Sequence, residues 1–173
     1  GNDHESLLAL LSKGGRLLVV RIAADDVAGQ HPIITELPQP RGAVTALALD
    51  ALLENLYVGT ADGQVVHVAL SETESPEMRA AYTVAASSTA VTTLGFLSGD
   101  RSLVVMSEDG AVSTWGLVRR ADAPSGWTLT RTHTLRAHNA PVTAFAPSQR
   151  VKGFVTGDRK GNLFLHHATS SQT

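Results

Sequence analysis

The sequence predicts an all-β protein built from a repeated unit of about four strands. Three stretches of the 173-residue chain align with one another, namely residues 43–70, 90–118 and 141–169. Each has a leading valine (Val44, Val91 and Val142) and a turn glycine (Gly63, Gly110 and Gly161). Both sets are spaced by 47 and then 51 residues. Two landmarks that keep the same offset through unequal insertions indicate one structural unit repeated.

The second unit shows how each strand is predicted. An apolar run from Val91 to Phe96 ends at Gly99–Asp100, and a second run covers Leu103–Met106. Asp109–Gly110 then predicts a tight hairpin turn of type I′, in which both central residues have positive φ, before the strand Ala111–Val118. Asp62–Gly63 predicts the same turn in the first unit. Lys160–Gly161 lacks the aspartate, so its turn could be of another type.

A fourth strand is expected before each unit, at Ile33–Leu37, Arg79–Ala85 and Trp127–Leu135. Two more strands, Leu7–Leu11 and Arg16–Ala23, flank Gly14–Gly15 at the start of the chain. No helix is predicted beyond a single turn at Asp50–Asn55. The period and about fourteen strands are typical of a β-propeller. The predicted fold is therefore a β-propeller fragment of about three and a half four-stranded blades in one domain, residues 1–173.

Composition excludes several functions. The net charge is −2 and the 14 Lys and Arg residues are scattered, whereas a nucleic-acid surface needs clustered cations. The absence of cysteine excludes disulfides and thiol chemistry. No apolar run reaches the roughly 18–20 residues that span a bilayer. The sequence thus predicts no nucleic-acid partner and no membrane span in this segment.

Three residues in the repeats resemble the WD40-like propeller family. His138 lies four residues before Val142, at the family's histidine between blades, and Thr156 matches its strand hydroxyl. Trp115, five residues after Gly110, matches its tryptophan, but Val68 and His166 occupy that position in the other two units. No unit is expected to carry the family's complete His–Ser/Thr–Asp–Trp hydrogen-bonded set. The resemblance implies a diverged propeller.

The last 40 residues also resemble the extracytoplasmic domain in the permease subunit of some bacterial phosphate ABC transporters. The matching residues are His138, Pro141, Val142, Ser148, Arg150, Lys152, Gly153, Phe154, Gly157, Asp158, Gly161, Asn162 and the run from His167 to Ser170. The resemblance implies a non-enzymatic, periplasmic part of a larger inner-membrane protein, with an interaction or regulatory role in phosphate transport. It also implies the partners: the other permease subunits, the ATPase subunits and a periplasmic phosphate-binding protein.

One weak ligand site is predicted from the residues themselves. Arg159, Lys160 and Gly161 lie in a glycine-flanked turn whose backbone N–H groups could form an anion nest, although charged residues at a hairpin tip are usually just solvated. Neighbouring residues on a strand point to opposite faces, so His166 and His167 are not expected to share a metal ion. No catalytic constellation, metal site or cofactor is predicted.

The strand count leaves the ring incomplete, since closed propellers have at least four blades. Two copies of three and a half blades would make seven, so a homodimer is one way to complete the ring. Three functions stay open: the transporter domain, a free-standing WD40-like scaffold that binds proteins, and a propeller hydrolase. The hydrolase ranks last, because acid and base residues do not converge in the sequence.

Overall fold

The computed structural model describes residues 6–22, 32–70, 78–97, 99, 101–123, 126–148, 150–151 and 153–167, without the side chains of 78–81. These residues form fourteen strands and no helix: β1 (Ser6–Leu11), β2 (Leu17–Ile22), β3 (Ile33–Leu37), β4 (Val44–Leu49), β5 (Asn55–Thr60), β6 (Gln64–Leu70), β7 (Met78–Ala85), β8 (Val91–Phe96), β9 (Leu103–Ser107), β10 (Val112–Arg119), β11 (Trp127–Thr134), β12 (Val142–Pro147), β13 (Gly153–Asp158) and β14 (Leu163–His167). The predicted all-β fold is confirmed.

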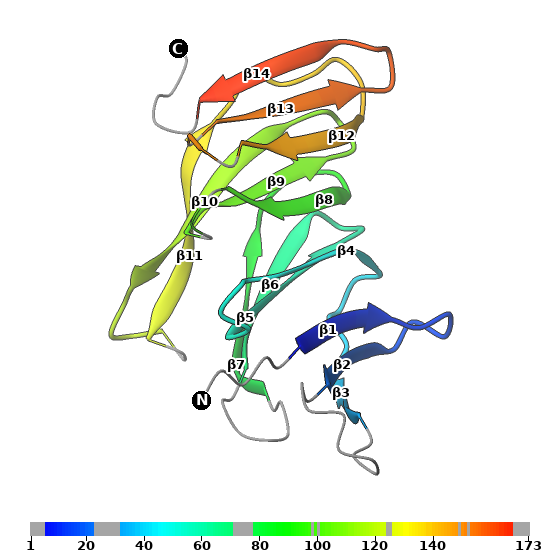
Figure 1. The fold of residues 1–173 in the computed structure, drawn as a ribbon, viewed down its shortest axis with the longest axis vertical. Coiled ribbons are helices and arrows are strands. Elements are labelled where there is room, and N and C mark those ends of the chain that lie inside the picture. Colours follow the sequence, from blue (N-terminus) through cyan, green and yellow to red (C-terminus); the bar gives the residue numbers. More distant parts are fainter. Residues whose placement is uncertain are drawn as a thin grey trace.

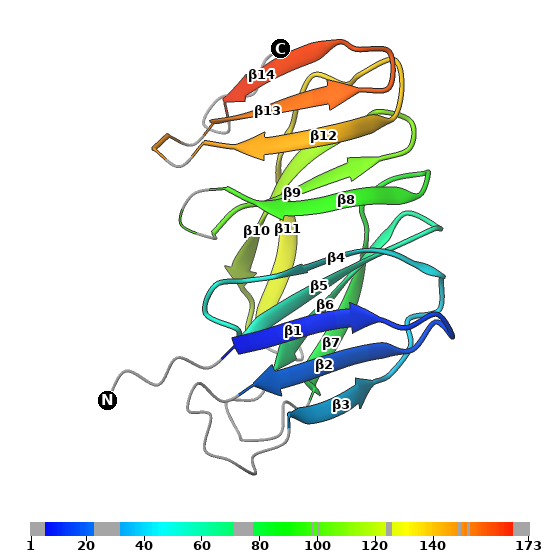
Figure 2. The same ribbon diagram turned by 45° about the vertical axis from the view of Figure 1, so that its right-hand side comes forward.

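The strands form four antiparallel sheets in chain order. Sheet I is β1–β2–β3, sheet II is β4–β5–β6–β7, sheet III is β8–β9–β10–β11 and sheet IV is β12–β13–β14. The sheets follow one another along the molecule, with sheets I and IV at opposite ends (Figure 1). Figure 2 shows β1, β4, β8 and β12 in succession on one side. Each sheet behaves as one propeller blade.

The fourteen strands amount to three and a half four-stranded blades, as predicted, and they are divided among four sheets. Sheets II and III have four strands, whereas sheets I and IV have three each. The turn between β1 and β2 carries Gly15 with positive φ, like the turn after β5, so β1 corresponds to the second strand of sheet II. Among the described residues, sheet I therefore lacks a first strand and sheet IV lacks a fourth. Two copies would combine eight sheets, not seven blades.

Apolar side chains fill the spaces between successive sheets. Because strand residues alternate between faces, an inner sheet contributes to the core on both of its sides. The buried side chains between sheets I and II are Leu7, Leu17, Val19, Leu37, Leu56, Val58, Val68 and Leu70. Those between sheets II and III include Tyr57, Val65, Val91, Leu94, Leu103, Val105, Trp115 and Leu129. Those between sheets III and IV are Leu97, Val104, Met106, Val112, Leu135, Val142 and Phe154.

The tight turns are not of type I′. In sheet II three residues separate the strands, and Gly63 N–H donates to the Thr60 carbonyl at 3.1 Å. Only the glycine has positive φ, at 79°, while the Asp62 carboxylate accepts a hydrogen bond from the Thr60 hydroxyl. This is a type I turn followed by a left-handed glycine. Gly110 and Gly161 repeat it with φ of 86° and 83°, so the turn at Lys160–Gly161 is of the same type.

The segment predicted to form a helical turn is a short hydrogen-bonded turn. Leu53 N–H donates to the Asp50 carbonyl, and the Asp50 carboxylate accepts from the N–H groups of Glu54 and Asn55. No helix long and apolar enough to cross a bilayer occurs in the part of the chain that the structure describes.

Candidate functional site

Sheet IV contains a buried chain of hydrogen bonds between two histidines. His138, in the linker before β12, places Nε2 2.7 Å from Thr156 Oγ1 on β13. The same hydroxyl lies 2.8 Å from Nε2 of His166 on β14. His138 Nδ1 lies 3.1 Å from the Asp158 carboxylate. All four side chains are buried, so the network ties the linker to two strands inside the core.

The donors and acceptors of this network can be assigned from one end. A carboxylate only accepts, so His138 Nδ1–H donates to Asp158. A neutral imidazole that donates from Nδ1 accepts at Nε2, so with His138 in that form its Nε2 accepts from the Thr156 hydroxyl, which in turn accepts from His166 Nε2–H. Burial, and secondarily His138, lowers the pKa of His166 to about 4, which keeps that ring neutral at neutral pH. Hydrogen bonds from Asn162, above all its side-chain amide, help to hold the pKa of Asp158 at about 2.

We expect stability to fall as the pH is lowered from 6.5 towards 4. In this window an unfolded histidine binds a proton, whereas the buried rings of His166 and His67, both with pKa near 4, do not. Protonation therefore favours the unfolded chain. The loss from Asp158 comes later, below its ordinary pKa of 3.8. Urea unfolding at pH 7 and 4.5 should show a smaller pH dependence for His166→Gln than for the original chain, and equal dependence would contradict the assignment.

The sequence missed this network as a unit, because the residue at the tryptophan position is a histidine. His166 lies five residues after Gly161, as Trp115 lies five after Gly110. In sheet III, Trp115 Nε1–H instead donates to Ser113 Oγ at 2.9 Å. Sheet IV therefore carries a complete hydrogen-bonded set in which His166 replaces the tryptophan. The equal offset from the turn glycine was the available signal.

Thr156, His138 and Asp158 also have the connectivity of a nucleophile, base and acid. However, Thr156 is fully buried at 0% exposure, and its hydroxyl is bound by an imidazole on each side. A substrate would have no access to that oxygen. The arrangement is thus suited to holding the linker in place.

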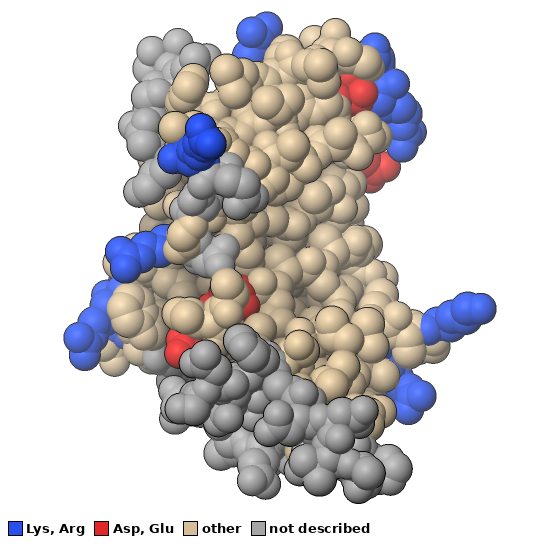
Figure 3. All heavy atoms as spheres, in the orientation of Figure 1, with Lys and Arg blue, Asp and Glu red and all other residues tan. Residues whose placement is uncertain are grey.

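In the turn predicted to bind an anion, the Asp158 side chain already accepts hydrogen bonds from backbone N–H groups. The N–H groups of Lys160 and Asn162 both donate to Asp158 Oδ1 at 2.9 Å, and Gly161 N–H donates to the Asp158 carbonyl. Arg159 N–H donates to the Pro141 carbonyl. Because these backbone N–H groups already have acceptors, an external anion at this turn would contact the Arg159 and Lys160 side chains and not a backbone nest. Figure 3 shows Lys and Arg side chains gathered at the end of sheet IV where β13 turns into β14. Anion binding at this turn stays a prediction.

His166 and His167 point to opposite faces of β14, as expected: His166 is buried and His167 is exposed. Across the described residues, no group of three or more His, Asp or Glu side chains is placed to hold a metal ion. Of the C-terminal motif, Lys152 and residues 168–170 lie outside the described residues.

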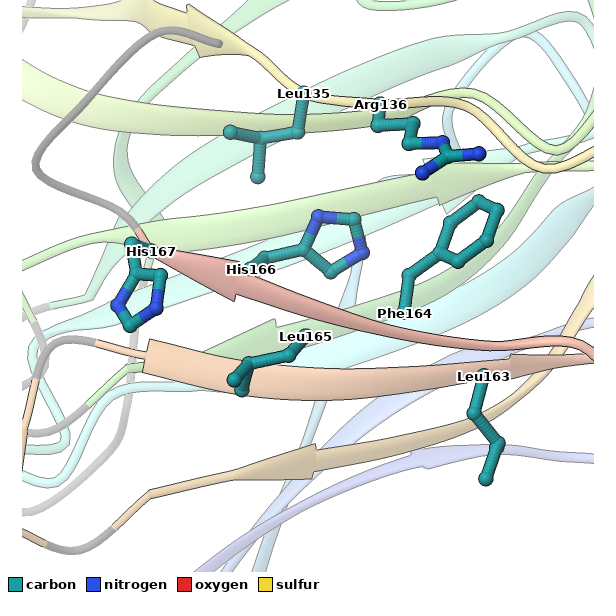
Figure 4. Close-up of a pocket in the computed structure, with 7 residues that line it drawn as sticks. All are labelled: Leu135, Arg136, Leu163, Phe164, Leu165, His166 and His167. Atoms are coloured by element: carbon teal, nitrogen blue, oxygen red, sulfur yellow. The ribbon is translucent and has the colours of Figure 1, made fainter.

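A groove of about 260 Å³ runs beside β14. Its lining consists of Leu135 and Arg136 from the linker and residues 163–167 of β14. Figure 4 shows Phe164 and His166 pointing towards the linker, with Leu163 and Leu165 on the other side of the strand. The Arg136 guanidinium carbon lies 4.3 Å from the centre of the Phe164 ring. In sheets II and III the corresponding edge is paired with a fourth strand, β7 or β11.

A second cavity of about 390 Å³ lies between the linker after β7 and sheet III. Its lining includes Ser87, Asp109 and Arg131. Ser87 stands four residues before Val91, at the position that His138 occupies in sheet IV. A serine is smaller than a histidine, which leaves this space open. Arg131 is held at its edge by a hydrogen bond to the Ala86 carbonyl and lies 4.8 Å above the Trp115 ring.

No family model matches the chain, and no curated protein matches its sequence. Solved structures do match its fold. The β-propeller domain of Cps50 (Swd1) from Myceliophteria thermophila aligns with 96% of this chain and 54% of its own length, at 18% identity and a TM-score of 0.70. The WD40 β-propeller domain of Doa1 aligns over 97% and 50%, at 22% identity and a TM-score of 0.66.

The computationally designed Ika4 protein aligns over 79% of this chain and 72% of its own, at 23% identity and a TM-score of 0.58. At these identities the likeness concerns the fold alone. This chain spans about half the length of the two natural propeller domains described above. Its four sheets in sequential order have the fold of a WD40-type β-propeller.

Proposed function

We propose that this chain is a non-enzymatic protein-interaction scaffold that binds an extended, acidic segment of a partner protein along the open edge of β14. The observation that carries the proposal is the groove beside this strand, which stands where sheets II and III hold a fourth strand. The protein-interaction role is supported by the WD40-type fold, and the place and chemistry of binding by the residues that line the groove.

The backbone of β14 offers hydrogen bonds to such a segment. Asp158 N–H donates to the Asn162 carbonyl, so the backbone groups of Asn162 point towards β13. Alternation then directs the N–H and C=O groups of Leu163, Leu165 and His167 to the outer edge. Within the described residues no strand pairs with that edge. Adding a strand there would satisfy these groups, as in other β-augmentation complexes.

Arg136 gives the groove its preference for an acidic partner. Its guanidinium lies over Phe164, and among the described residues no carboxylate is within ion-pair distance of it. A glutamate or aspartate in the added strand would supply that carboxylate. The edge thus provides sequence-independent affinity, and Arg136 provides selection by charge.

A synthetic peptide can serve as the probe. The sequence of β11, residues 127–134, already pairs with sheet III, and a version with Arg131→Glu places an acid in it. We expect the acidic peptide to bind more tightly than the parent peptide by about fivefold, the size of one exposed ion pair of about 1 kcal/mol. Hydrogen exchange should show new protection at Leu165 and His167.

The Arg136→Glu chain should reverse the order of the two peptides. Lys13→Glu changes the net charge equally but lies in the exposed turn between β1 and β2, and it should leave the order unchanged. If neither peptide protects β14 at millimolar concentration, the proposed function is wrong.

The second candidate is the periplasmic domain of a phosphate-transporter permease at the bacterial inner membrane. It is favoured by the C-terminal motif, although the structure gives many of the motif residues a role within the fold. His138 and Asp158 belong to the buried network, the exposed Asn162 donates to Asp158, and Gly161 forms the turn. Calorimetric titration of the chain with inorganic phosphate separates the two candidates. Heat of phosphate binding that is seen with the original chain and lost in the Arg159→Ala variant would favour the transporter.

A further inference from the structure

The outer face of sheet IV is apolar and uncovered. Leu163 and Leu165 are 73% and 65% exposed. The corresponding side chains, at the same offsets from the turn glycine, are only 0–1% exposed in the inner sheets: Val65 and His67 in sheet II, Val112 and Thr114 in sheet III. The difference is that sheets III and IV cover those positions. The outer face of sheet IV therefore has the composition of a covered face.

A pair of small residues on this face, which lies beside the Leu163 side chain, repeats a pair that another sheet covers elsewhere in the chain. In sheet II, Gly59 pairs with Ala46, and a Cβ at Gly59 would meet the Val91 side chain of sheet III. In sheet IV, Gly157 pairs with Ala144 at the same register. Among the described residues, no side chain of a following sheet occupies the space over Gly157. Small residues at this position permit close approach of another sheet.

Sheet I presents the complementary face. Leu8, Leu10 and Ile22 are 46%, 46% and 42% exposed. Their counterparts in sheet II, at the same offsets from the turn glycine, are Leu56, Val58 and Leu70, which are 0–3% exposed because sheet I covers them. The chain thus carries the two unlike halves of one junction, one at each end, and forms the complete junction three times in between.

We infer that two copies of this chain associate head to tail, with sheet IV of each copy packed on sheet I of the other. The interface continues the packing seen between successive sheets, and the twofold arrangement closes into a ring of eight sheets. Solved propeller domains with about twice the residues of this chain are consistent with that size. The inference does not rest on the proposed function: the added strand would pair with the backbone edge of β14, whereas the second copy would cover the face that carries Leu163 and Leu165, two residues that also line the groove.

The inferred junction between sheet IV and sheet I is smaller than the three junctions within the chain, because the described part of sheet I has no first strand. β1 corresponds to β5, so the described part of sheet I has no equivalent of β4 or β8, the strands that lead the inner junctions. Association should therefore depend on concentration over the micromolar range, so that monomer and dimer are both observable.

Sedimentation velocity over a hundredfold range of concentration measures this association. Leu163→Glu on sheet IV and Leu10→Lys on sheet I should each weaken it by at least tenfold, because each buries an unpaired charge. Leu52→Glu serves as the matched control: it introduces the same charge as Leu163→Glu at an apolar residue that is 74% exposed in the β4–β5 turn, and it should dimerise like the original chain.

Mixing the two interface variants gives the decisive result. One junction of the mixed pair has both original faces, and the other brings the introduced glutamate of one copy towards the introduced lysine of the other. We therefore expect the mixture to recover a dimer that neither variant forms alone. A chain that stays monomeric throughout would overturn the inference. A second outcome would also overturn it: the Leu163→Glu variant loses the dimer, the Leu10→Lys variant keeps it, and mixing the two does not restore it. That result would mean that sheet IV of one copy packs on sheet IV of the other.

Discussion

Replacing Phe154 by alanine is expected to lower the free energy of unfolding by about 3–5 kcal/mol. Phe154 is 1% exposed and belongs to the core between sheets III and IV. Its ring stacks on His166 at 4.7 Å between centres and meets Phe145 edge-on at 5.5 Å. Truncation would leave a cavity and loosen the imidazole that completes the hydrogen-bonded network. Urea unfolding at pH 7 measures the change.

The matched control is a truncation on the opposite face of the same sheet. Leu165 is 65% exposed, so Leu165→Ala should change stability by less than about 0.5 kcal/mol at a concentration where the chain is monomeric. Equal losses from the two variants would mean that sheet IV is not packed on sheet III as described.

Gly110→Ala is expected to destabilise the fold by about 3 kcal/mol. Gly110 has φ of 86°, a conformation that costs about 1–2 kcal/mol for alanine. A Cβ there would also collide with the carbonyl oxygen of His138. Moving that linker weakens the hydrogen bond from His138 N–H to the Gly110 carbonyl, now 2.9 Å, which adds about 1 kcal/mol. Thermal or urea unfolding measures the total.

Gly161→Ala separates the two causes. Gly161 occupies the same place in the turn of sheet IV, with φ of 83°, but nothing lies within 4 Å of a Cβ there. Only the conformational cost remains, so we expect a loss of about 1–2 kcal/mol. A loss as large as that of Gly110→Ala would show that the collision with the linker contributes nothing.

The sequence predicted most of the fold because its signals are local. Alternating apolar residues and the turn glycines place the strands, and the constant offset between Val44 and Gly63, or Val91 and Gly110, reveals the repeat. The predicted turn type was wrong, because Asp–Gly occurs in both two-residue and three-residue hairpin loops. The hydrogen bond from Gly63 N–H to the Thr60 carbonyl distinguishes the two, and it is seen only in the structure.

The candidate site was predicted only in parts. His138, Thr156 and Trp115 were recognised at the family positions, but the union of His138 with Thr156, Asp158 and His166 depends on how the linker packs over sheet IV. The groove beside β14 could not be predicted at all. It lies between β14, whose outer edge has no paired strand among the described residues, and the linker residues Leu135 and Arg136, and no residue of β14 itself encodes this arrangement.

By itself, then, the sequence determined the number and order of the strands and the composition of every sheet face, since hydrophobic alternation and turn residues act over a few positions. Only the tertiary structure decided how fourteen strands divide into sheets of three, four, four and three. It also decided which equivalent faces are covered: Val65 and Leu163 have the same place in the repeat, yet one is buried and the other is 73% exposed. Burial depends on the neighbouring sheet, and that is a property of the assembled chain.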